Sequence, residues 1–142
     1  MIVTKQVAHG EPGGKNVNKW LTVVIGVSAR RQRFANLAVQ HLVAAGYPVV
    51  ALGNRAGWVD AVPIVTGMPA LSGVHTVTLY LNAERQKAYY AYLLRLRPMR
   101  VIFNPGTENE ELAALMQQVG TEVVEACTLT LLASGRYGPP TD

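Results

Sequence analysis

Short apolar runs alternate along the chain with segments in which apolar residues recur every three or four positions. The first run, residues 20–25, is rich in β-branched residues and almost continuously apolar, which predicts a strand covered on both faces. Further strands are predicted at 48–52, 62–65, 74–81, 101–103 and 122–125. The helical spacing predicts helices at 34–45, 83–96 and 108–119, and a closing helical turn at 128–134.

The residues that flank these segments indicate where the helices begin and end. Gly46 and Gly120 stand where a helix C-terminus is expected, and Asn82 stands where it would cap the second helix. Residues 107–110 match a capping box, so Thr107 is expected to cap the third helix. On the first helix, Phe34 belongs to the apolar stripe that is expected to face the core.

Strand and helix alternate from residue 20 onward, a pattern typical of an α/β fold. We therefore expect a Rossmann-like three-layer fold with a central parallel sheet of five or six strands. The order of the strands should switch beside the first one. The chain has 142 residues, which is enough for one such domain over 19–142. Residues 1–18, with the breaker-rich stretch 9–14, are interpreted as an N-terminal arm.

Composition narrows the class of protein. Hydrophobic residues make up 49% and charged residues 15%, which is typical of a globular chain, and no apolar run is long enough to cross a membrane. A secretory pattern is missing at the start, and the single cysteine permits no internal disulfide, so we expect a cytoplasmic location.

The net charge of +4 comes without a polybasic run, so neither nucleic acid nor a membrane is expected as a partner. The three histidines lack metal-ligand spacing, so no metal site is predicted, and Cys127 is interpreted as a buried structural thiol.

The loop after the first predicted strand carries the strongest candidate chemistry. In parallel sheets, ligands bind at the carboxyl ends of the strands, beside the switch in strand order. Gly26 would let the backbone approach a phosphate closely, Ser28 adds a hydroxyl donor, and the start of the next helix adds partial positive charge. Arg33 can bind phosphate oxygens through two N–H groups at once, and Val27 and Arg30 belong to the same loop. The sequence therefore favours an anion site here.

Two features of this loop limit the prediction. A dinucleotide fingerprint has a second glycine where this chain has Ser28, and Arg31 is expected to point to solvent. A tight strand-to-helix turn at Gly26, with solvated arginines around it, is the alternative interpretation.

The ends of the other strands complete the candidate site. After the second strand, an NAD-binding domain usually offers an acid to the ribose hydroxyls, but here Arg55 follows Asn54. Arg55 suits an extra phosphate on the ribose, which both NADP and coenzyme A carry; a solvated surface arginine is the equal alternative. The remaining strand ends contribute Leu81, Asn82, Pro105 and Gly106.

These segments, in this order, resemble the CoA-binding domain family, the compact cytoplasmic proteins related to the nucleotide-binding domain of succinyl-CoA synthetase. The resemblance extends from Val23 to about Leu129 and places Arg33 at the family's loop arginine. Its motifs are Val24-Ile25-Gly26-Val27-Ser28, Gly46-Tyr47-Pro48-Val49-Val50, Phe103-Asn104-Pro105-Gly106, Asn109-Glu110-Glu111 and the stretch from Gly120 to Cys127. The chain departs from the family's usual residues at the ligand edge, where it has Gly53-Asn54-Arg55, Leu81-Asn82 and Phe103-Asn104-Pro105.

The resemblance implies that the chain binds coenzyme A or an acyl-CoA through its Gly-x-Ser phosphate loop. We therefore expect a small-molecule nucleotide ligand. Because no convincing base or nucleophile accompanies this edge of the sheet, we expect no catalysis by the chain itself. Two alternatives remain open: an NADP-dependent reductase, and a structural or interaction subunit that binds no ligand. Protein partners and a homo-oligomeric state are also left open.

Overall fold

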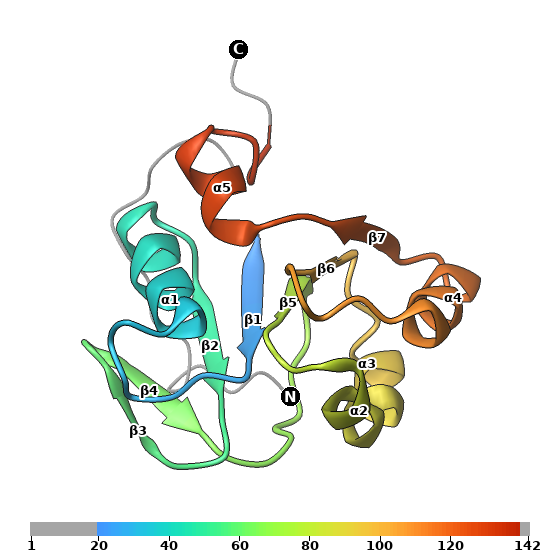
Figure 1. Ribbon diagram of the computed structural model, residues 1–142, viewed down its shortest axis with the longest axis horizontal. Coiled ribbons are helices and arrows are strands. Elements are labelled where there is room, and N and C mark those ends of the chain that lie inside the picture. The colour runs from blue at the N-terminus through green and yellow to red at the C-terminus, as the bar shows by residue number, and fades with distance from the viewer. Residues whose placement is uncertain (1–19, 140–142) are drawn as a thin grey trace.

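A seven-stranded sheet forms the centre of the computed structural model, which describes residues 20–139 (Figure 1). The predicted N-terminal arm, residues 1–18, lies outside the described residues. The strands are β1 (Leu21–Ile25), β2 (Val49–Leu52), β3 (Gly57–Val59), β4 (Val62–Val65), β5 (Val74–Leu79), β6 (Arg100–Phe103) and β7 (Glu122–Glu125). Their order across the sheet is β3-β4-β2-β1-β5-β6-β7.

The predicted α/β, Rossmann-like fold is confirmed, and the strand order does switch beside β1. This strand pairs in parallel with β2 on one side and with β5 on the other. The count of five or six parallel strands missed β3, which pairs antiparallel with β4 and makes the sheet seven-stranded. The hairpin turns at Asp60, whose φ of 51° is unusual for a residue with a side chain.

Helices cover both faces of the sheet. They are α1 (Phe34–Ala44), α2 (Ala83–Gln86), the 3₁₀ helix η3 (Lys87–Tyr89), α3 (Tyr90–Leu96), α4 (Glu110–Gln118) and α5 (Thr128–Ala133). One apolar cluster joins the sheet to α1 and α5, and a second joins it to α3 and α4, so the sheet is the middle of three layers (Figure 1). Within residues 20–139, we find no helix with the length and apolar character that spanning a membrane requires.

Two helix boundaries differ from the predictions. The helix predicted over 83–96 is divided into α2, η3 and α3, and no proline or glycine marks the division. Thr107 does not cap α4: its hydroxyl donates to the Asn104 carbonyl, and Asn109 takes the capping position, accepting a hydrogen bond from Leu112 N at 3.1 Å. The prediction for Asn82 is confirmed, because its side chain accepts from Arg85 N at 2.9 Å at the start of α2.

A buried arginine lies at the amino end of β6. Arg100 donates from Nε to Thr76 Oγ1 and from Nη1 to the Tyr137 carbonyl, both at 3.0 Å. Its guanidinium also lies over the rings of Trp20 and Tyr137, at 5.1 and 4.5 Å from their centroids. His75 stacks on Trp20 with 3.7 Å between the ring centroids. Burial, and then the charge of Arg100, lower the pKa of His75 to about 4.

His75 gives the stability of the fold a pH dependence of known sign. The folded state disfavours the protonated ring. The contribution of neutral His75 to the free energy of unfolding is therefore complete above the ordinary pKa of 6.5 and is lost as the pH falls toward about 4. We expect the free energy of unfolding, measured by urea denaturation across this range, to fall more steeply with acid in the wild type than in His75→Gln. The control His41→Gln, at an exposed position, should keep the wild-type slope. An unchanged slope in His75→Gln would contradict the prediction.

Candidate functional site

A cavity of about 730 Å³ lies at the carboxyl ends of β1, β2, β5 and β6. Its volume is within the usual range for small-molecule sites. The structure brings all of the predicted site residues into its lining: Gly26, Val27, Ser28, Arg30, Arg33, Asn54, Arg55, Leu81, Asn82, Pro105 and Gly106. The role of these residues in binding stays a prediction, but their gathering around one cavity follows from the strand order.

Two glycines allow the loops around this cavity to touch. Gly26 has a φ of +104°, and a Cβ there would lie 3.2 Å from the backbone carbon and oxygen of Tyr80. A Cβ on Gly53 would lie only 2.1 Å from the carbonyl oxygen of Val27. The Leu52 carbonyl accepts from the N–H groups of Gly26 and Val27, at 3.0 and 2.9 Å. These two N–H groups therefore hold the loop in place, and the phosphate donors expected from the loop must come from residues further along.

The beginning of α1 supplies such donors. Its N-cap residue, Arg33, makes no side-chain cap, and the first turn contains no acidic residue. The first N–H groups of a helix have no partner within it, and they carry partial positive charge. Phe34 and Ala35, the first residues of α1, line the cavity. The prediction that Phe34 packs into the core was wrong: the residue is 70% exposed and lines the cavity.

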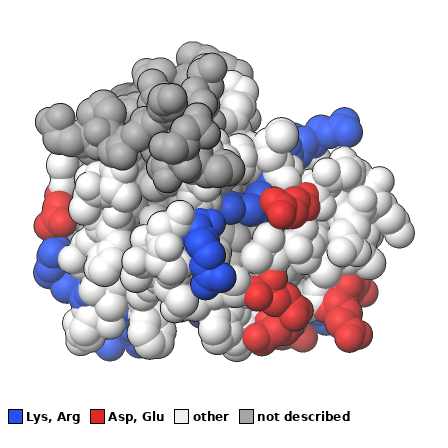
Figure 2. All heavy atoms as spheres, turned by 90° about the horizontal axis from the view of Figure 1, so that it is seen from above, with Lys and Arg blue, Asp and Glu red and all other residues white. Residues whose placement is uncertain are grey.

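The charged residues in the lining of the cavity are all positive. The lining contains Arg30, Arg33, Arg55 and Arg85, all exposed, and no aspartate or glutamate. The carboxylate of Glu108 contacts the lining, where it accepts a hydrogen bond from Gly106 N at 3.0 Å. Within residues 20–139, none of the four guanidinium groups forms a salt bridge. Figure 2 shows a different distribution on the side seen from above Figure 1, where acidic and basic side chains lie side by side. The cavity is thus suited to an anion of high charge.

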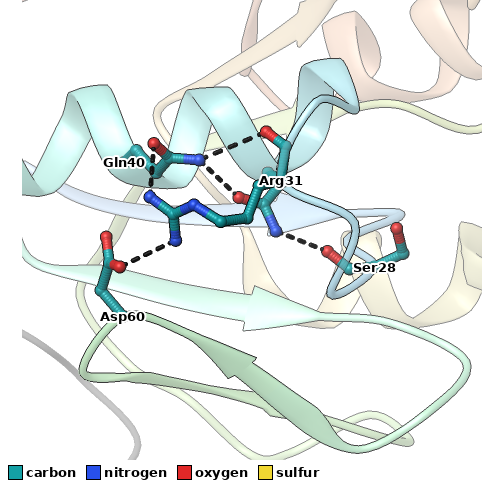
Figure 3. Close-up of polar contacts among 5 residues, drawn as sticks. Ser28, Arg31, Gln40 and Asp60 are labelled. Carbon is teal, nitrogen blue, oxygen red and sulfur yellow. Dashed lines mark hydrogen bonds and ion pairs between the residues drawn. The ribbon is translucent and has the colours of Figure 1, made fainter.

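Arg31 is exposed, as expected, but its guanidinium is also paired with other side chains. Its guanidinium donates to Asp60 Oδ1 at 2.8 Å and to Gln40 Oε1 at 3.0 Å (Figure 3). Asp60 lies in the turn between β3 and β4, whereas Gln40 belongs to α1. Arg31 therefore connects the loop after β1 to the hairpin, and its charge is compensated, unlike the charges of the four lining arginines.

A buried amide holds the loop after β1 in place. Asn36 is fully buried and donates from Nδ2 to the Ser28 carbonyl at 2.8 Å. Gln40 Nε2 donates in turn to Asn36 Oδ1 at 2.7 Å. The Ser28 hydroxyl accepts a long hydrogen bond of 3.4 Å from Arg30 N, so it keeps its own proton to donate. Sequence reasoning missed Asn36, because a polar residue in a surface helix usually faces solvent.

Three further lining residues that sequence reasoning missed come from the segment after β5, which includes α2 and η3. Tyr80, Arg85 and Tyr89 all line the cavity, Arg85 and Tyr89 one helical turn apart. Burial raises the pKa of Tyr80 to about 12, so its phenol is neutral at physiological pH. The side chain of Asn82 is occupied in capping α2. This part of the lining therefore adds one cation, Arg85, to the cavity.

Cys127 lies outside the lining of the cavity and is half-buried, not buried as expected. Burial raises the pKa of its thiol, but hydrogen bonds with the side chain and backbone of Thr130 and with the backbone of Leu129 outweigh it, and the pKa is lowered. Among residues 20–139, no group of three or more histidine, cysteine, aspartate or glutamate side chains could hold a metal ion.

Comparison with known protein families identifies the family of this chain. Residues 21–133 match the family model described as a CoA binding domain. The chain belongs to the CoA binding domain family. The match extends from the start of β1 to the last residue of α5, and so includes every loop of the cavity. Comparison with curated proteins found no match.

Solved structures share the family's fold. One crystal structure, described only as that of an uncharacterized protein, is 41% identical, with a TM-score of 0.80 over 82% of this chain and 97% of that one. A hypothetical protein from Pyrococcus horikoshii OT3 is 18% identical, with a TM-score of 0.71 over 82% of this chain and 83% of that one. A Thermus thermophilus structure, cell-free ID.343, is also 18% identical, with a TM-score of 0.71 over 82% and 90% of the two chains. The last two show likeness of fold alone.

The close approach at Gly53 predicts a position that tolerates no side chain. In Gly53→Ala the new Cβ would overlap the Val27 carbonyl, so the loop after β1 must move. We expect the variant to lose about 1–3 kcal/mol of stability, measured by chemical denaturation. Gly57→Ala is the matched control, because its Cβ would lie 3.5 Å from its nearest neighbours, an ordinary contact. Equal stabilities of the two variants would show that the loops do not fit as closely as described.

Proposed function

We propose that this chain binds coenzyme A or an acyl-CoA in the cavity at the carboxyl ends of β1, β2, β5 and β6, and catalyses no reaction by itself. The observation that carries the proposal is the combination at the start of α1: an uncapped helix terminus opens onto a cavity with four arginines and no acid. Helix termini of this kind bind phosphate groups. Membership of the CoA binding domain family supports the choice of ligand.

The charge of the ligand fits the charge of the cavity. Coenzyme A carries a diphosphate and a ribose 3′-phosphate, together about four negative charges near neutral pH. The lining offers four arginines without a carboxylate partner among residues 20–139. A ligand with fewer phosphates would leave part of this positive charge uncompensated in the bound state.

The order of the loops suggests how the ligand lies. We place the diphosphate over Gly26–Ser28, beside the start of α1 and within reach of Arg33. The adenosine and its 3′-phosphate would lie against the loop after β2, where Arg55 offers a charge-assisted hydrogen bond. The pantetheine arm would then extend across β1 to the loops after β5 and β6, toward residues 104–107.

The absence of catalysis is inferred from the composition of the lining. Within the described residues, the lining contains no histidine, cysteine, aspartate, glutamate or lysine, the side chains that most often act as general bases. Ser28 and Thr107 do line the cavity, but a hydroxyl needs an adjacent base to act as a nucleophile. The phenol of Tyr80 is held neutral by burial. The chemistry of a bound acyl-CoA lies in its thioester; the residues of this chain would bind and orient it.

Removal of Arg33 tests the phosphate site. Because a hydrogen bond to a charged group contributes about 1.5–3 kcal/mol, Arg33→Ala should weaken CoA binding by this amount in calorimetric titration, with the fold intact. Lys87→Ala is the matched control: it removes the same charge from an exposed position outside the lining. Equal affinities of the wild type and Arg33→Ala would place the phosphates elsewhere.

Comparison of ligands tests the proposal against a reductase and an interaction subunit. We expect CoA to bind more tightly than NADPH, because no acidic or glycine-rich partner awaits a nicotinamide ribose. CoA without its 3′-phosphate should bind the wild type more weakly than CoA does. This loss of affinity should be no larger than the loss that Arg55→Ala causes in the binding of CoA. All affinities should fall with added salt. Tighter binding of NADPH would favour the reductase, and no binding of either ligand at millimolar concentration would favour the interaction subunit.

A further inference from the structure

Gln86 is a polar side chain buried next to the cavity. It is the last residue of α2 and is fully buried, although its neighbours Arg85 and Lys87 are exposed. A buried amide with unmet hydrogen bonds would destabilise the fold, so its partners determine what it does.

The amide nitrogen of Gln86 joins two loops of the cavity. Its Nε2 donates to the Leu81 carbonyl at 2.8 Å and to the Thr107 carbonyl at 2.7 Å. Both residues line the cavity, Leu81 from the loop after β5 and Thr107 from the loop after β6. The regular pairing of these strands ends at Leu79 and Phe103, so beyond that point Gln86 links the two loops in place of the sheet.

The amide oxygen of Gln86 is hydrogen-bonded as well. Gln86 Oε1 accepts from Asn109 Nδ2 at 2.9 Å, and the same nitrogen donates to the Tyr90 hydroxyl at 2.9 Å. That hydroxyl donates to Glu111 Oε1, also at 2.9 Å. Both donors and the acceptor of Gln86 are therefore satisfied, which fixes the orientation of its amide and the separation of the two carbonyls.

We propose that Gln86 is a positioning residue for the half of the cavity between the loops after β5 and β6, and that this half holds the pantetheine arm of CoA. The assignment rests on the proposed function and adds a specific role for a residue that touches no ligand. Gln86 acts through the backbone of Leu81 and Thr107. Asn36 acts in the same way on the backbone of Ser28, in the half of the cavity that would hold the phosphates.

Two ligands separate the halves of the site: CoA, and 3′-phosphoadenosine 5′-diphosphate, which is CoA without the pantetheine arm. The wild type should bind CoA more tightly. In Gln86→Met, which keeps the length of the side chain but makes no hydrogen bonds, CoA affinity should fall by about tenfold while the fragment's affinity is unchanged. Asn36→Leu is the mirror variant and should lower both affinities by the same factor. Calorimetric titration measures all of them.

A second variant guards against misfolding of Gln86→Met. Gln86→Glu keeps the length and an acceptor for Asn109, but even when protonated it donates to only one of the two carbonyls. It should show the same selective loss of CoA affinity. An equal loss for both ligands in the Gln86 variants, unchanged CoA affinity, or a wild type that binds the fragment as tightly as CoA would overturn the inference. Binding of neither ligand to the wild type would instead overturn the proposed function.

Discussion

The contact between the loops after β1, β2 and β5 is the constraint on which the rest of the cavity depends. Parallel strands in the order β2-β1-β5 bring these loops to one edge of the sheet, and the two glycines let them touch there. The Leu52 carbonyl then accepts two N–H groups from the loop after β1 and turns the chain toward α1. Gly26 and Gly53 thus allow the close path of the loop that leads from β1 toward α1.

Buried amides complete this framework. Asn36 holds the Ser28 carbonyl and Gln86 holds the carbonyls of Leu81 and Thr107. Asn104 donates to the Leu79 carbonyl at 2.9 Å and accepts from Thr128 N at 2.9 Å. Loop carbonyls at the end of a sheet have no strand partner, and each would be costly if buried unpaired. An amide satisfies a carbonyl and a donor at once, so one side chain can fix two segments.

The layers of the fold could be predicted from the sequence because each central strand is buried on both faces and leaves an uninterrupted apolar signal. β3 could not, since three residues that include Gly57 and the exposed Trp58 carry no periodic pattern. The eleven predicted site residues lie where strands end, and their gathering follows from topology. Arg85, Asn36 and Gln86 were missed because a polar residue in a helix is usually solvated; only tertiary contacts show that two of them are buried.

The cavity therefore divides its work between two kinds of side chain. The amides are buried and neutral, and the nitrogen and oxygen of each are hydrogen-bonded, so they hold the backbone at little electrostatic cost. The lining arginines are exposed and lack carboxylate partners among the described residues, and like charges gathered in one cavity repel each other. Arg31 shows the alternative, since its pairing with Asp60 removes it from such a role. The uncompensated positive charge lies beside a helix start without a side-chain cap, and an anion bound in the cavity would reduce the repulsion among the arginines, which the fold alone does not relieve.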